Sequence, residues 1–218
     1  YSDLSRYSSR GWNARDAVSQ DAQLWLEKGW MDMLFPMMYF DGDHYYPFLA
    51  DWKENDHGRP VVPGLGIYFL NEREKDWPLL TVQRQMYVAR NEGLGGQAFF
   101  RAQFFLKNEK GLYDWAKNIF YAQPALIPPM TWCDSIAPAA PHVEQTFEGN
   151  TLQLKWDAVT DNDGPVSYNV YRLDNVLGDV LLATRLRQTH YEKWLALPAL
   201  KHSRYVVTAV DVYGNESK

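Results

Sequence analysis

The sequence predicts an α/β region followed by an all-β sandwich, and three observations support this prediction. Between residues 16 and 121, apolar runs typical of buried strands alternate with segments that have the helical period. A segment rich in Pro and Ala, 122–141, interrupts this pattern and is typical of a stiff interdomain linker. After the linker, apolar residues recur at a period of two in short segments, which indicates antiparallel strands.

The segment 29–46 gives the clearest signal in the first region. An apolar run, 31–40, is followed at once by a polar and aromatic group, 41–46. A short apolar run bounded by turn signals predicts a strand buried on both faces, as in a parallel sheet. Pro36 is a defect in this strand, because proline has no N–H to donate to a ladder.

The remaining elements of the first region follow the same logic. Segments with the helical period are 16–28, 77–92 and 112–121, with a short helix around 48–52. Two more apolar runs predict buried strands, 61–70 and 97–100. Helices that alternate with strands imply parallel strands. Three strands are too few for a closed barrel of eight, so the region is predicted to be the C-terminal part of a larger α/β domain.

The second region has the alternation of a sandwich. Its predicted strands are 151–156, 168–171, 180–183, 189–194 and 205–212. Asp-Asn-Asp-Gly and Tyr-Gly-Asn sequences supply turns between them. Trp156, Tyr168 and Tyr205 are expected in the core of this sandwich.

Composition narrows the classes of partner. The chain has 218 residues, a net charge of -5 and no Lys/Arg-rich run, which gives no support for nucleic-acid binding. The single cysteine, Cys133, excludes an internal disulfide and a cysteine metal cluster, and we predict no metal site and no cofactor. No apolar run is long enough to predict a transmembrane segment. The high content of Trp, Tyr and Phe favours a carbohydrate partner, since aromatic faces stack on sugar rings.

The region 136–218 resembles a fibronectin type III domain. The matching segments are 152–156 as strand B, 168–172 as strand C, and 205–211 with the turn 213–215 as strand F. Leu200 fits the hydrophobic position that precedes the tyrosine of strand F. The resemblance implies a last strand that should begin at Lys218, where this sequence stops. We therefore expect this domain to lack that strand and to have an open edge, because the domain is cut short or because the strand comes from elsewhere.

The region 1–135 resembles the glycosyl-hydrolase-like family 10 proteins, which include bacterial lipoproteins. The matching segments are Trp25-Leu, 29–32, 35–39, 59–62, 64–68, 95–99, 124–126 and 128–132. The resemblance implies the C-terminal part of a TIM-type (β/α)8 barrel and an exported protein, periplasmic or lipid-anchored at the cell envelope. It also implies hydrolysis of polysaccharide or peptidoglycan glycan. Many members have Gln where this chain has Met38.

Glycosidic cleavage requires two carboxyl groups, and in a barrel these lie at the C-terminal ends of strands. Asp41 and Asp43 follow the first predicted strand and Glu72 follows the second, so these three are the catalytic candidates. Each could instead be an ordinary turn residue. Asp32 precedes its strand, and we expect it to cap or pair.

Six other side chains are candidates for binding substrate: Trp12, Tyr39, His44, Tyr45, Tyr68 and Arg101. The tyrosines and Trp12 could stack on sugars or pack in the core and loops. His44 could be a surface residue. Arg101 could pair with an acid of the barrel or contact an anionic group of the substrate.

Two functions remain open at this point. The chain could be the C-terminal segment of an exported glycoside hydrolase, or a non-catalytic protein that binds glycan or assembles at the cell surface. Taken alone, the segment is expected to be inactive and to form homo-oligomers through its open strand edges.

Overall fold

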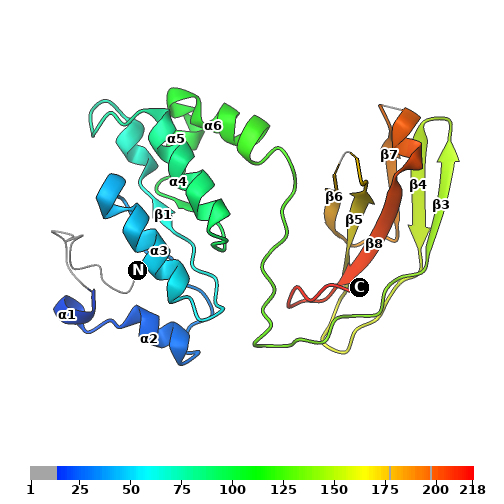
Figure 1. The fold of residues 1–218 in the computed structure, drawn as a ribbon, viewed down its shortest axis with the longest axis horizontal. Helices are drawn as coiled ribbons and strands as arrows, with labels where there is room; N and C mark the ends of the chain where they lie inside the picture. Colours follow the sequence, from blue (N-terminus) through cyan, green and yellow to red (C-terminus); the bar gives the residue numbers. More distant parts are fainter. Residues whose placement is uncertain (1–13, 177, 197) are drawn as a thin grey trace. The chain divides into compact units, whose positions relative to one another are not determined.

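The computed structural model describes residues 14–176, 178–196 and 198–218. The chain divides into two compact units between Ile119 and Phe120 (Figure 1). The predicted domain boundary lay later, at 135/136. Among the described residues, no helix is both long enough and apolar enough to cross a membrane.

The first unit mixes helices with very short strands. Its helices are α1 (Ala14–Val18), α2 (Ala22–Glu27), α3 (Tyr46–Glu54), α4 (Leu79–Asn91), α5 (Gln103–Leu106) and α6 (Leu112–Trp115). The 3-10 turns are η1 (Gly42–His44), η2 (Ile67–Leu70) and η3 (Glu109–Gly111), and a π-helical turn, η4 (Ala116–Phe120), follows α6. The strands are β1 (Gly64–Leu65) and β2 (Ala98–Phe99).

Three segments run parallel, as the helix–strand alternation predicts. β1 pairs with β2 in parallel, with Gly64 opposite Ala98. Parallel bridges join Leu34 to Val61 and Met37 to Gly64. The three segments therefore share one direction, and their C-terminal ends lie at the same edge.

The prediction of a buried strand over 31–40 is wrong. This segment makes only isolated bridges, and Phe35 and Met37 are 58% and 74% exposed. Pro36 has no N–H for a ladder, which limits regular pairing here. The predicted strand 61–70 is also shorter than expected, because residues 67–70 form the 3-10 turn η2.

The helices at 48–52 and 77–92 are confirmed as α3 and α4. The predicted helix 16–28 is instead split into α1 and α2. The break lies at Ser19, which has a φ of 57°, and α2 begins anew where Asp21 accepts a hydrogen bond from Leu24 N at 3.1 Å.

The second unit is a sandwich of two antiparallel sheets. Its strands are β3 (Val143–Glu148), β4 (Thr151–Trp156), β5 (Ser167–Leu173), β6 (Val180–Leu186), β7 (His190–Trp194) and β8 (Arg204–Val210), with the turn η5 (Pro198–His202) before β8. One sheet has the order β3-β4-β7 and the other β6-β5-β8. The sequence missed only β3.

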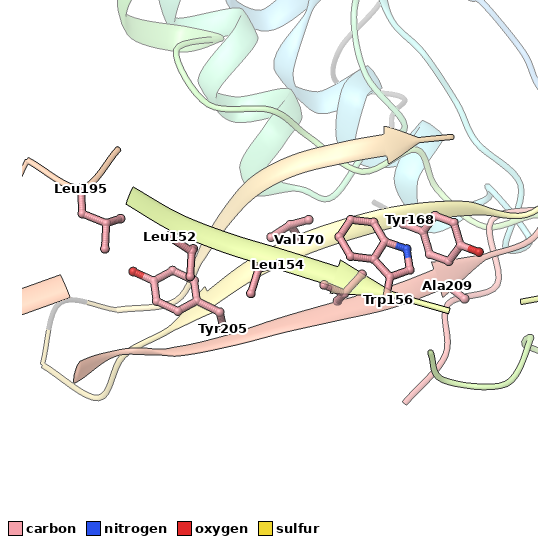
Figure 2. Packing of buried hydrophobic residues seen from close by; sticks show 9 residues of the cluster. Leu152, Leu154, Trp156, Tyr168, Val170, Leu195, Tyr205 and Ala209 are labelled. Carbon is pink, nitrogen blue, oxygen red and sulfur yellow. The ribbon is translucent and has the colours of Figure 1, made fainter. Parts of the chain in front are cut away.

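The core of the sandwich lies between the two sheets (Figure 2). Alternate residues of β4 point into it, and Leu152, Leu154 and Trp156 are at most 6% exposed. Tyr168 and Tyr205 are buried in the same cluster, which confirms the predicted core. The Tyr205 hydroxyl donates a hydrogen bond to Leu200 O at 2.7 Å, the tyrosine corner of this fold class.

Part of the Pro-rich segment belongs to the second unit. Met130 N donates to Tyr213 O at 2.7 Å. The Asn215 amide nitrogen donates to the backbone and side-chain oxygens of Asp134, at 3.1 Å each. These hydrogen bonds join residues 130–134 to the turn that follows β8. This part of the Pro-rich segment therefore packs on the second unit instead of forming an unattached linker.

The chain also continues along β8 after this turn. Glu216 forms an antiparallel bridge with Val210, and Ser217 N donates to Ala209 O at 2.9 Å. Residues 216–217 therefore occupy the position where a last strand beside β8 begins.

Candidate functional site

The C-terminal ends of the three parallel segments meet in a cluster of aromatic rings. The rings of Tyr39 and Phe100 stack with centroids 5.5 Å apart. Tyr68 lies edge-on to both, at 6.0 Å from Tyr39 and 5.8 Å from Phe100. The two tyrosines predicted to bind substrate are thus in contact with each other, and we call these three residues the aromatic cluster.

Two glycines allow this close approach. A Cβ on Gly64 would lie 3.0 Å from the carbonyl oxygen of Pro36. A Cβ on Gly66 would lie 3.0 Å from Tyr39 Cβ and 3.3 Å from Tyr68 Cε1. The absence of a side chain at these positions lets the segment that carries Tyr39 pack directly on β1.

We therefore expect Gly66→Ala to displace the Tyr39 and Tyr68 rings. Overpacking of this kind typically costs about 1–3 kcal/mol of stability. Thermal unfolding and near-ultraviolet circular dichroism measure the two effects. An unchanged aromatic spectrum together with an unchanged melting temperature would show that the aromatic cluster does not depend on this contact.

A surface groove of about 510 Å³ lies at the same edge. Residues 71–74 line one side of it, and Arg101, Gln103, Phe104 and Lys107 line the other. Residues 71–74 follow η2, and the other four lie in or next to α5, which follows β2, so the direction of the strands brings Glu72 and Arg101 to one place. We call this the strand-end groove.

The groove and the aromatic cluster are electrostatically linked through Tyr68. Burial raises the pKa of the Tyr68 hydroxyl, and the Glu74 carboxylate and Tyr39 raise it further. A tyrosine hydroxyl is protonated at neutral pH even without such a shift, so this one can donate a hydrogen bond.

Asp41 and Asp43 do not line the strand-end groove. Both are exposed, at the start of and within η1. Asp43 lines a second groove of about 490 Å³ together with Tyr46 and residues of α3 and α4. Of the three predicted catalytic acids, only Glu72 lines the strand-end groove.

The other predicted substrate-binding residues differ in their surroundings. His44 is exposed. Tyr45 is fully buried and its ring packs edge-on against Tyr46 at 5.1 Å, so burial favours the packing alternative for it. Burial also raises the pKa of Tyr45. Trp12 lies outside the described residues.

Asp32 forms an ion pair with Arg59, with Oδ1 3.0 Å from Nη1. This agrees with the pairing role expected for an acid that precedes its strand.

Sequence reasoning missed three charged residues of the strand-end groove: Arg73, Glu74 and Lys107. One signal could have found two of them. The residues from Glu72 to Asp76 are all charged and follow Asn71, the C-cap of η2, at the end of a parallel segment. Across the described ranges, the structure has no group of three or more His, Cys, Asp or Glu side chains placed to hold a metal ion.

Comparisons with known proteins support the resemblance seen in the sequence. No protein-family model matches the chain. It is 30% identical over 225 residues to the protein named glycosyl hydrolase YngK of Bacillus subtilis (strain 168), an alignment that covers 93% of this chain. The chain spans 43% of that relative's length, less than half. It is thus homologous to a bacterial glycosyl hydrolase.

A similar solved structure is a Fn3-like protein from Clostridium thermocellum. It is 29% identical and covers 38% of this chain and 85% of its own, with a TM-score of 0.30. The antiparallel sheets and the tyrosine corner described above independently make the second unit fibronectin type III-like.

Proposed function

We propose that this homologue of a bacterial glycosyl hydrolase is the C-terminal segment of an exported glycoside hydrolase that acts on polysaccharide or peptidoglycan glycan. In this proposal the first unit supplies the last β/α units of a (β/α)8 barrel, and a longer parent protein supplies the others. The parent is periplasmic or lipid-anchored at the cell envelope. The fibronectin-like unit serves as a spacer or as a docking module for the barrel.

The observation that carries this proposal is the strand-end groove. Two of its charged residues, Glu72 and Arg101, and the neighbouring aromatic cluster all lie at the C-terminal ends of parallel segments. Catalytic groups of barrel enzymes occupy this face, and aromatic rings beside a carboxylate suit a sugar ring. The homology to a glycosyl hydrolase supports the same reaction.

The test is cleavage by the full-length parent protein of a panel of peptidoglycan and polysaccharide glycans, with release of reducing ends as the measurement. We expect cleavage of at least one glycan. A panel left entirely uncut, by a folded protein, would overturn the proposed hydrolase function.

One observation favours a second function, that of a non-catalytic glycan-binding protein. Hydrolysis requires two carboxyl groups that flank the bond. Among the described residues, the strand-end groove contains the acids Glu72 and Glu74, which are neighbours on one loop, whereas Asp41 and Asp43 do not line it. This alternative predicts glycan binding that Tyr39→Ala weakens, without turnover.

The barrel proposal also predicts self-association of the 218-residue chain. In the segment 30–37, Trp30, Phe35 and Met37 are 67%, 58% and 74% exposed. In the proposed barrel this segment would face the remaining strands of the parent protein. Exposed apolar faces and unpaired edges favour association. Light scattering should show oligomers, and the double variant Phe35→Gln/Met37→Gln should reduce them. A monomer at all concentrations would count against the barrel.

A further inference from the structure

The guanidinium of Arg101 is one of three positive charges that line the strand-end groove. Arg101 is exposed, and among the described residues no carboxylate lies within 4.0 Å of it. Glu72 and Glu74 line the same groove without pairing with it. The sequence left open an ion pair between Arg101 and an acid of the barrel. In the described part of the chain, no carboxylate forms this ion pair.

The neighbouring Gln103 holds this guanidinium from one side. With its amide oxygen turned toward Arg101, Gln103 accepts hydrogen bonds from Nη2 at 3.0 Å and from Nε at 3.1 Å. A guanidinium has five N–H donors in a fixed planar fork. Gln103 uses the edge formed by Nε and Nη2, so the edge formed by Nη1 and Nη2 remains available. That edge matches the two oxygens of a carboxylate.

The local charge balance points the same way. Arg73, Arg101 and Lys107 line the groove against Glu72 and Glu74, so its charged side chains leave an excess of one positive charge. The chain as a whole has a net charge of -5. A positive groove on a negative protein favours a ligand that carries negative charge.

We propose that the strand-end groove is a subsite for a carboxylate-bearing sugar, with Arg101 as its specificity-determining residue and Gln103 as the residue that positions it. The proposal rests on the proposed hydrolase function and adds to it the substrate class. The carboxylate is that of a uronic acid or of an ether-linked lactyl group, since both present the same two oxygens to the guanidinium.

The test compares matched glycans with the full-length parent protein. One arm uses oligosaccharides that contain uronic acid, and a second uses oligosaccharides that contain muramic acid. Each arm is run with its carboxyl-reduced counterpart, which keeps the sugar and loses the charge. Titration calorimetry measures binding, and reducing-end release measures cleavage. The arm that shows a carboxylate preference identifies the source of the carboxylate.

We expect at least about tenfold tighter binding of one carboxylated glycan than of its reduced counterpart, since a hydrogen bond to a charged group is a strong one. Arg101→Gln should abolish this preference, so that the carboxylated glycan and its reduced counterpart bind equally. Gln103→Glu should also abolish it, because the new carboxylate would pair with Arg101 in place of the ligand. The control is Arg187→Gln, which removes an exposed arginine of the other unit.

Equal binding of both carboxylated glycans and their reduced forms would overturn the subsite and leave the hydrolase function intact, provided that glycan is cleaved. A carboxylate preference that survives Arg101→Gln would also overturn it. Absence of all cleavage would overturn the hydrolase function alone, since the binding preference is measured independently of turnover.

Discussion

Glu72→Gln should reduce glycan cleavage by the full-length parent protein by about 10²–10⁴-fold, the usual contribution of a positioned acid or base. Glu72 is the one predicted catalytic acid that lines the strand-end groove. The substitution removes the ionisable group and preserves the shape of the side chain. Because Glu72 is exposed, the melting temperature should not change. Initial rates of reducing-end release and a thermal melt measure both quantities.

The informative comparison is with Asp43→Asn, since Asp43 lies in the second groove. We expect the Glu72 variant to lose far more activity than the Asp43 variant. Glu27→Gln, at an exposed acid of α2 that pairs with its neighbour Lys28, is the control. If Asp43→Asn abolished cleavage and Glu72→Gln did not, the catalytic acid would have to be reassigned to η1.

Glu216→Ala should destabilise the fibronectin-like unit by about 2–4 kcal/mol, because it leaves buried donors without an acceptor. Glu216 Oε1 accepts hydrogen bonds from Asn169 Nδ2 at 3.0 Å, from the Tyr171 hydroxyl at 2.7 Å and from the Thr208 hydroxyl. Asn169 is 2% exposed, so its amide has little access to solvent in place of the lost oxygen. Burial and the Glu216 carboxylate raise the pKa of Tyr171 to about 12, which keeps it a donor.

Hydrogen–deuterium exchange by mass spectrometry measures this effect within the intact chain. Peptides from β5 and β8 should exchange faster in Glu216→Ala, while peptides from the first unit should not change. Glu192→Ala, an exposed acid on β7, is the matched control. Equal protection of β8 in Glu216→Ala and Glu192→Ala would show that the buried network contributes little.

The sequence predicted best where a structure depends on local periodicity. Leu152, Leu154 and Trp156 alternate along β4, and this period alone places them on one face. The helical period located α4 in the same way. The mixed α/β first unit and the fibronectin-like second unit follow from such patterns. Whether the first unit completes a barrel stays a prediction.

For the apolar run 31–40, the sequence pattern predicted burial that the tertiary structure does not show. Its hydrophobicity indicated a strand covered on both faces, yet Phe35 and Met37 are exposed. Hydrophobicity along the chain says that a residue favours burial, but only the neighbouring segments decide whether it is covered. Tyr45 gives the converse case, since a residue in a polar loop is fully buried beneath its neighbours.

The sequence by itself determined the two-part organisation, the direction of the parallel segments and the rule that functional groups follow strand ends. Only the tertiary structure decided which of those groups share a groove. Glu72 and Arg101 are far apart in the chain and meet because two parallel segments bring their loops together, whereas Asp43 lines a different groove. The physical reason is that periodicity is set by backbone geometry within a few residues, while a site depends on long-range packing.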